Sequence, residues 1–210
     1  MCGIAGFAWK EIGRPADIKV VRGMADSISH RGPYDQGFFG AQPVACDRPR
    51  LSIIDLTEGG HKLMRSDDGA LIIIFNSEIY NHVEVREELR LRRFRFHFQS
   101  DTEIMLAGYR AWGEDCVLRF HGMWLSAIYE QTCDTVFFCR DHLGIMPLYR
   151  SDRGSCFVFC SEIKGIVTAL EEVRKVNYAY LRHFLPLGEP DDGAETMFEG
   201  VLSPEAGHMS

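Results

Sequence analysis

The stretch Met1-Cys2-Gly3-Ile4-Ala5-Gly6-Phe7 opens the chain and puts a cysteine in the second position. The small Cys2 side chain permits removal of the initiator Met1, which leaves a thiol and a free α-amine on one residue. An α-amine has a pKa of about 7.7–8.0 and a thiol one of about 8.5, so the amine can accept the thiol's proton as a general base. The stretch therefore predicts a nucleophile and its base within one residue, flanked by Gly3 and Gly6, which permit close backbone approach. The alternative is the ordinary start of a β-strand.

The composition is typical of a globular protein and argues against two classes of partner. The formal net charge of the 210 residues is −7, whereas binding to nucleic acid needs clustered Lys and Arg. No apolar run approaches the roughly 20 residues that a membrane helix requires, and the N-terminus lacks the layout of a signal peptide. We therefore expect neither a nucleic acid nor a membrane as a partner.

The cysteines indicate neither a disulfide framework nor a metal site. There are seven, at irregular spacings and without a Cys-x-x-Cys pair, which is not the arrangement of either. Reduced thiols fit a cytoplasmic location best. Apart from Cys2, we expect the cysteines to serve as small buried apolar residues.

Alternating and helical apolar patterns along the chain predict strands in two groups, with helices between and around them. The predicted strands are residues 2–9, 36–46, 50–56, 71–75, 122–129, 135–140, 147–151 and 156–160. The predicted helices are residues 16–29, 81–92, 100–112, 162–170 and 178–185. Asn81 and Ser100 are the expected N-caps of the second and third of these helices. This order predicts an α+β layered domain with antiparallel sheets.

Three polar groups follow or open apolar strands, and each has two interpretations. Arg50 could bind a carboxylate through two parallel hydrogen bonds, or lie on the surface. The Asn76 side chain and the Ser77 N–H could stabilise an oxyanion, or form a turn in which the asparagine bonds its own backbone. Asp101 could hold an ammonium group, or favour a helix N-terminus through the dipole. On spacing alone, the turn and the dipole are the favoured interpretations.

Eight motifs occur together in the order of one known family. They are Met1-Cys2-Gly3-Ile4, His30-Arg31-Gly32-Pro33, Arg50-Leu51-Ser52-Ile53-Ile54-Asp55-Leu56, Phe75-Asn76-Ser77-Glu78-Ile79-Tyr80-Asn81, Ser100-Asp101-Thr102-Glu103, Gly122-Met123, Arg140-Asp141-His142-Leu143-Gly144-Ile145-Met146-Pro147-Leu148-Tyr149 and Ser161-Glu162-Ile163-Lys164. The chain resembles the glutaminase domain of glutamine-hydrolysing asparagine synthetases, which are class II glutamine amidotransferases. The resemblance implies a four-layer αββα sandwich of two antiparallel sheets, of the N-terminal nucleophile hydrolase type. It implies that residues 1–187 form the glutaminase domain and residues 188–210 a tail leading toward a synthetase domain.

The resemblance also assigns a role to particular residues of this chain. The expected activity is hydrolysis of the glutamine side-chain amide to glutamate and ammonia through a thioester. The implied catalytic residues are Cys2 as nucleophile, with the Asn76 side chain and the Ser77 N–H as oxyanion hole. The implied substrate-binding residues are Arg50 for the α-carboxylate, Asp101 and Glu78 for the ammonium, and the backbone of Leu51 and Ile53.

The chain departs from the family pattern at three places. Ser77 replaces a glycine, Tyr34 replaces an aspartate, and His61-Lys62-Leu63-Met64 stands where the family has Gln-Pro-Met. If the backbone at Ser77 needs a positive φ, serine would be strained by about 1 kcal/mol or more. These departures motivate a second hypothesis, a catalytically silent domain that binds glutamine or a partner.

The ammonia is expected to serve the synthesis of asparagine or a related amide by an ATP-dependent synthetase domain. Its Ser-Gly-Gly-x-Asp-Ser loop does not occur in these 210 residues, so we expect no cofactor here, with ATP and Mg bound only by a synthetase domain. Such a domain, or a homodimer, is a possible partner. Glutamine hydrolysis should then not depend on ATP or aspartate, and it should follow the fraction of chains that have lost Met1.

The last residues have few large apolar groups. Their one apolar cluster, Met197, Phe198, Val201 and Leu202, could dock on the domain or remain exposed. Because ordering a residue costs roughly 1 kcal/mol or more, we expect a mobile tail beyond about Gly188.

Overall fold

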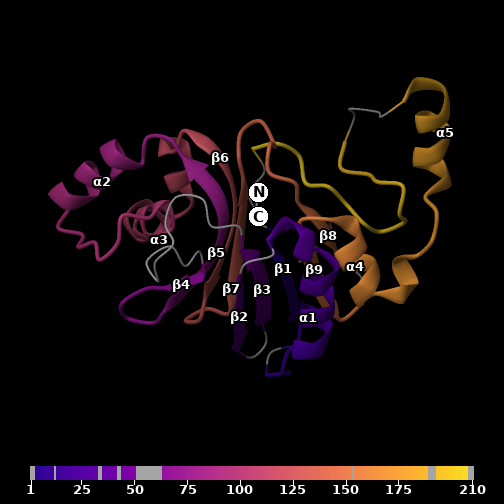
Figure 1. Cartoon of the computed structure of the whole chain (residues 1–210), viewed down its shortest axis with the longest axis horizontal. Coiled ribbons are helices and arrows are strands. Elements are labelled where there is room, and N and C mark those ends of the chain that lie inside the picture. Colours follow the sequence, from indigo (N-terminus) through magenta and orange to yellow (C-terminus); the bar gives the residue numbers. More distant parts are fainter. Residues whose placement is uncertain are drawn as a thin grey trace. The chain divides into compact units, whose positions relative to one another are not determined.

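The computed structural model describes residues 3–11, 13–32, 35–41, 44–50, 63–152, 154–188 and 193–207. The chain divides into two compact units, each with its own sheet (Figure 1). The first unit is Met1–Arg50 with Pro147–Glu205, and the second is Leu51–Met146 with Ala206–Ser210.

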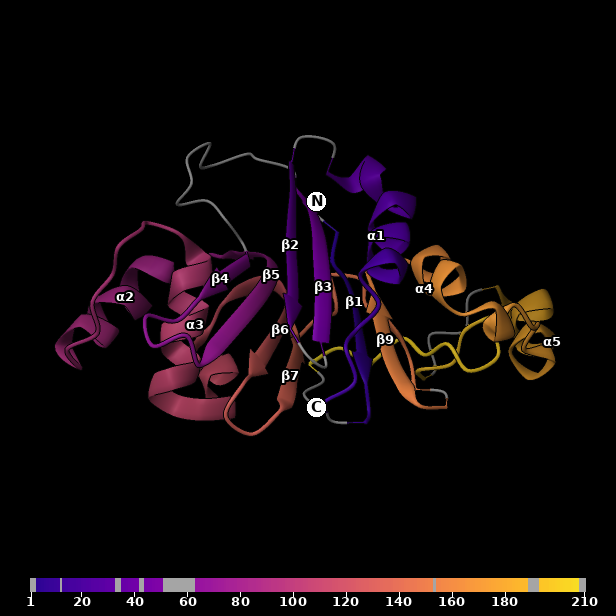
Figure 2. The same ribbon diagram turned by 90° about the horizontal axis from the view of Figure 1, so that it is seen from below.

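The first unit is built on a five-stranded antiparallel sheet in the order β2-β3-β1-β9-β8, so that the strand following Cys2 is central. The strands are β1 (Ala5–Trp9), β2 (Asp35–Ala41), β3 (Val44–Arg50), β8 (Tyr149–Ser151) and β9 (Cys156–Cys160). The helices of this unit are α1 (Ile18–Ser27), α4 (Ile163–Ala169) and α5 (Tyr178–Leu187), with short 3₁₀ segments at Ser29–Arg31 and Glu171–Val173. Figure 2 shows α1 running beside β1 and β3.

The core of this unit forms where the apolar side of helix α1 packs against the apolar face of the sheet. Val21 and Met24 face the sheet from α1 because they are three residues apart, and Ala5 and Phe7 face them because strand side chains alternate. Ile166 of α4 completes the same cluster. The core thus fixes the strand that begins three residues after Cys2.

Gly6 allows β9 to pack against β1. A Cβ on Gly6 would lie 2.1 Å from the ring of Phe159, which is fully buried, and one on Gly3 would lie 2.7 Å from Ile28. Both glycines of the opening stretch therefore make room for side chains of the core. The close approach predicted at these glycines is thus made by Ile28 and Phe159 of this chain.

We predict that Gly6→Ala will lower the free energy of unfolding by about 1–3 kcal/mol, because the methyl group overlaps Phe159. Urea unfolding of the purified chain measures the loss. Gly23→Ala is the matched control, since its Cβ would be 3.6 Å from Thr168 in helix α1, and it should stabilise by about 0.5–1 kcal/mol. If both variants were equally stable, the packing role of Gly6 would be wrong.

The second unit has a four-stranded antiparallel sheet in the order β4-β5-β6-β7. Its strands are β4 (Leu63–Arg65), β5 (Leu71–Ile79), β6 (Gly122–Glu130) and β7 (Thr135–Arg140). Its helices are α2 (His82–Leu91) and α3 (Asp101–Trp112), followed by a 3₁₀ segment at Gly113–Arg119. Each unit is thus a sheet covered by helices, which is one half of the expected four-layer arrangement.

The alternation along β5 decides where its polar residues point. Ile73 and Phe75 pack with Ile104 and Met105 of α3, so residues of odd number face the helices. Ser77 continues this odd series. Asn76 and Glu78 continue the even series, on the opposite face of the strand.

Several predicted elements require correction. The strand expected at residues 36–46 is two paired strands, β2 and β3, and Pro43 in that run was the available sign of a break. Strand β5 does not end at Asn76 but continues to Ile79. The predicted strand at 50–56 lies, apart from Arg50, outside the described residues, and the short strand β4 was not predicted.

The remaining elements match the prediction within a few residues, with a change at two caps. The Asn81 side chain makes no cap bond to α2; its amide binds Arg119 O and His121 N, each at 2.9 Å. Ser100 caps α3 as expected, but the Glu103 carboxylate accepts from His97 and Phe98 N–H groups rather than closing a capping box. The four predicted strands after residue 121 are present, two in each sheet.

Residues 193–205 belong to the first unit, and their apolar cluster is docked on it. Val201 is fully buried in the core of that unit, and Phe198 packs against it. Leu202 and Arg150 exchange two backbone hydrogen bonds of 2.8 Å, and Thr196 Oγ1 donates to Val201 O. Of the two alternatives for this apolar cluster, the structure has the docked one. Among the described residues, no helix has the length and apolar character to cross a bilayer.

Candidate active site

Four of the eight expected site residues lie in the described part of the second unit. Asn76, Ser77 and Glu78 are consecutive in β5, and Asp101 is the first residue of α3. The backbone of Arg50 ends β3, where it pairs with Asp35, but its side chain lies outside the description. Cys2, Leu51 and Ile53 also lie outside the described residues.

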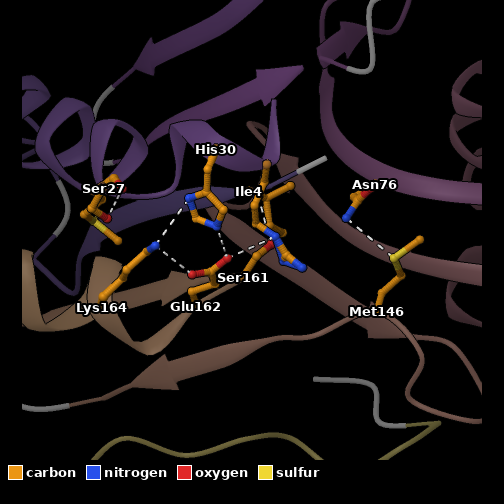
Figure 3. Close-up of polar contacts among 10 residues, drawn as sticks. Ile4, Ser27, His30, Asn76, Met146, Ser161, Glu162 and Lys164 are labelled. Atoms are coloured by element: carbon orange, nitrogen blue, oxygen red, sulfur yellow. Dashed lines mark hydrogen bonds and ion pairs between the residues drawn. The ribbon is translucent and has the colours of Figure 1, made fainter. Parts of the chain in front are cut away.

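Ser161 holds the beginning of β1 through two reciprocal hydrogen bonds (Figure 3). Its Oγ accepts from Ile4 N–H at 2.9 Å, and its own N–H donates to Ile4 O at 2.9 Å. Both residues are fully buried. These bonds therefore fix the beginning of β1, which follows the expected nucleophile in the sequence.

The Glu162 carboxylate, next to Ser161, lies close to three basic side chains; Figure 3 labels two of them, His30 and Lys164. Its carboxylate lies 2.8 Å from His30 Nε2, 3.2 Å from Arg31 Nε and 3.0 Å from Lys164 Nζ. Partial burial alone would raise the pKa of Glu162, but the bonds from Lys164 and His30 outweigh it and lower that pKa. Glu162 therefore remains ionised at neutral pH and holds Arg31 in place.

Arg31 is a candidate functional residue to which the sequence analysis gave no role. A Cβ on Gly3 would sit 3.5 Å from its Cδ, so the side chain passes beside the chain that follows Cys2. Its Nη1 is buried and has no hydrogen-bond partner among the described residues. A buried N–H donor without an acceptor destabilises the folded state. Arg31 is therefore suited to binding an acceptor atom of a substrate, or one from residues outside the described ranges. The sequence signal was its place in the motif with His30.

Asn76 is a buried strand residue. It pairs with Leu125 in the β5–β6 ladder and is 2% exposed. Its Nδ2 lies 3.6 Å from Met146 Sδ (Figure 3), and a thioether is a weak acceptor. The turn interpretation of Asn76 is wrong, and the amide side chain stands on the face of β5 opposite to α3.

Met146 is positioned by a loop built around a buried carboxylate. Asp141, which is fully buried, accepts from the N–H groups of Leu143, Ile145 and Met146 at 2.9–3.2 Å. The Arg140 guanidinium donates to Met146 O and Gly144 O at 2.7 and 2.6 Å. The loop motif quoted from the sequence thus fixes the residue that contacts Asn76.

We predict that Asp141→Ala will destabilise the chain by about 3 kcal/mol or more, because three N–H donors lose their acceptor. Asp141→Asn keeps one accepting oxygen and should lose less. Urea unfolding compares both with Asp152→Ala, which breaks only an exposed ion pair to Lys10 and should change stability by no more than about 0.5 kcal/mol. Equal stability of the Ala variants at 141 and 152 would contradict the assigned role.

A hydrogen bond joins two of the described site residues, Ser77 and Asp101. Ser77 Oγ donates to Asp101 Oδ2 at 2.8 Å, and Ser77 is 1% exposed. Ser77 lies in regular strand pairing with Trp124 and is not among the residues with positive φ. The strain considered for a serine at this position therefore does not arise.

The described cysteines are not equivalent. Burial raises the pKa of Cys116 to about 12 and that of Cys160 to about 11, and it also raises the pKa of Cys139. These thiols are therefore protonated and unreactive at neutral pH. Cys133 is exposed, which corrects the expectation that every cysteine other than Cys2 is buried. Among the described residues, no three His, Cys, Asp or Glu side chains are grouped to hold a metal ion.

The chain is similar in sequence to glutamine-hydrolyzing asparagine synthetases. Asparagine synthetase (glutamine-hydrolyzing) 3 of Bacillus subtilis is 32% identical over 99% of the chain, which spans 34% of that relative. Asparagine synthetase (glutamine-hydrolyzing) 1 of the same organism is 37% identical over 82% of the chain, which spans 28% of it. The chain thus spans about a third of the length of these relatives.

The fold is shared with a more distant solved structure. The glutamine phosphoribosylpyrophosphate amidotransferase of Bacillus subtilis, complexed with ADP and GMP, matches with a TM-score of 0.64 at 18% identity, over 80% of this chain and 43% of that one. This likeness confirms the predicted α+β fold of the N-terminal nucleophile hydrolase type with two antiparallel sheets. A family profile described as "Glutamine amidotransferase domain" matches residues 1–210. The chain therefore belongs to the glutamine amidotransferase domain family.

Proposed function

We propose that this chain hydrolyses the side-chain amide of glutamine to glutamate and ammonia, with Cys2 as the nucleophile. The observation that carries the proposal is the arrangement at the end of β5. There a buried amide, Asn76, directly precedes Ser77, whose hydroxyl binds the Asp101 carboxylate. A group suited to an oxyanion and a group that holds an ammonium-binding carboxylate thus come from consecutive residues of one strand. Membership of the amidotransferase family supports the same activity.

The proposed reaction is an acyl transfer in two steps. The α-amine of Cys2 takes the thiol proton, the thiolate attacks the amide carbon, and the proton passes to the departing ammonia. The Asn76 side chain and the Ser77 N–H donate to the oxygen that becomes negatively charged. Water then attacks the resulting glutamyl thioester, with the same amine as base, and releases glutamate and the thiol.

The remaining expected residues bind the amino-acid part of the substrate. Arg50 would hold the α-carboxylate, because a guanidinium matches a carboxylate with two parallel hydrogen bonds. Asp101 and Glu78 would hold the α-ammonium. The backbone of Leu51 and Ile53 would line the pocket.

The use of the ammonia is a finer proposal that rests on the relatives. Two of them are named asparagine synthetases and are about three times as long as this chain. We propose that the ammonia serves synthesis of asparagine or a related amide by an ATP-dependent synthetase domain, and that ATP and Mg bind there. The cytoplasmic location and a homodimer also remain proposals.

The proposal is tested by measuring ammonia released from glutamine by chains from which Met1 has been removed. We expect steady release, with or without ATP and aspartate. Asparagine, whose side chain is shorter by one methylene, should react much more slowly. Calorimetric binding of glutamine without any release of ammonia would contradict the proposal and favour the silent domain, although the strain that motivated that alternative at Ser77 is absent.

A further inference from the structure

The contact between Ser77 and Asp101 links two elements that are 24 residues apart in the sequence. Ser77 is buried on the α3 face of β5, and Asp101 is the partly buried first residue of α3. Ser77 Oγ is the one donor bonded to the Asp101 carboxylate in the part of the chain that the structure describes. The hydroxyl stands where the resembled family has a glycine, so this bond is a feature of the present chain.

The helix does not need this bond for its own stability. The α3 N-terminus is already capped by Ser100, whose Oγ accepts from Glu103 N–H. The helix is also anchored by Ile104 and Met105, which are fully buried against the sheet. A role in holding α3 would therefore be redundant.

The bond instead restricts the orientation of the carboxylate. The terminal torsion of an aspartate is broad, so an unrestrained carboxylate presents either oxygen over a wide range of directions. A hydroxyl that holds Oδ2 directs Oδ1 to the remaining space, and a pre-oriented group loses less entropy when it binds a ligand.

We propose that the Ser77 hydroxyl orients Asp101 for the α-ammonium of the substrate and so sets the selectivity of this chain for amides that carry an α-amine. This inference rests on the proposed glutamine hydrolysis and assigns Ser77 a second role besides its backbone N–H. Ser77 is in this respect a positioning residue, since its side chain acts through Asp101.

The test compares glutamine with glutaramate, which has the same amide and carboxylate but lacks the amine. Ser77→Ala should lower kcat/KM for glutamine about tenfold, mainly through a higher KM. It should leave kcat/KM for glutaramate unchanged within about twofold. The ratio of the two values therefore falls about tenfold, whereas general loosening of the site would lower both values together. Ser77→Gly removes the same hydroxyl and should lower the ratio as much as Ser77→Ala does. Ser77→Thr keeps a hydroxyl and should return the ratio to that of the unmodified chain.

Two further variants make the result specific. Ser126→Ala removes another fully buried hydroxyl, on the neighbouring strand β6, and should change neither substrate's kcat/KM. In an Asp101→Ala background, Ser77→Ala should have no additional effect, because residues that act as a unit are not additive. An unchanged ratio in both Ser77→Ala and Ser77→Gly, with glutamine still hydrolysed, would overturn the inference alone. Absence of glutamine hydrolysis in the unmodified chain would overturn the proposed function, and this inference with it.

Discussion

Cys2→Ala is expected to lower kcat for glutamine hydrolysis by at least about 10³-fold, because the thiol is the group that forms the covalent bond. Removing a nucleophile leaves only the rate enhancement due to binding and oxyanion stabilisation. The fold should persist, since Ser161 and the core of the first unit hold β1 in place. Ammonia release and thermal unfolding, measured on the same preparation, test both expectations.

Cys133→Ala is the matched control for this experiment. Cys133 is the exposed thiol among the described cysteines, so its removal tests whether another accessible thiol contributes. It should leave kcat and KM unchanged. Loss of activity in Cys133→Ala together with full activity in Cys2→Ala would reassign the nucleophile.

Asn76→Ala is expected to lower kcat by roughly 10²–10³-fold with little change in KM, because an oxyanion donor acts on the charge that develops in the transition state. The contact that the variant loses with Met146 is a weak one, at 3.6 Å from nitrogen to sulfur. The buried amide also loses its other contacts in this variant, so some loss of stability is expected besides the loss of kcat. Steady-state kinetics and urea unfolding separate the two effects.

Asn81→Ala provides the opposite pattern. The Asn81 side chain bridges Arg119 O and His121 N, so its removal should lower stability by about 1–3 kcal/mol and leave kcat unchanged. If Asn76→Ala raised KM alone, or if both variants lowered kcat equally, the oxyanion role of Asn76 would be wrong.

The elements of this fold were predictable where the local pattern is strong. The apolar run at 71–75 and the capped helix at Ser100 depend on neighbouring residues, and both are present. The ends of elements were less predictable. Strand β5 continues through Asn76 to Ile79 because its partner β6 extends equally far, from Gly122 to Glu130. That pairing joins segments about fifty residues apart, and no local pattern reports it.

The identities of the candidate site residues came from motifs, but their mutual arrangement did not. The bond from Ser77 to Asp101 depends on where α3 begins relative to the face of β5. The pair formed by Ile4 and Ser161 joins residues 157 apart. The role of Arg31 becomes visible only because its Nη1 is buried without an acceptor among the described residues. Contacts of this kind are set by packing, which composition and spacing do not specify.

The central claim is that glutamine is cleaved through a thioester on Cys2, and trapping that intermediate tests it most directly. The chain without Met1 is mixed rapidly with glutamine, quenched in acid, digested and examined by mass spectrometry. We predict a glutamyl group on the N-terminal peptide that contains Cys2, absent in Cys2→Ala and lost on treatment with hydroxylamine. Steady ammonia release with no glutamyl group on that peptide, or with the group on another residue, would contradict the claim.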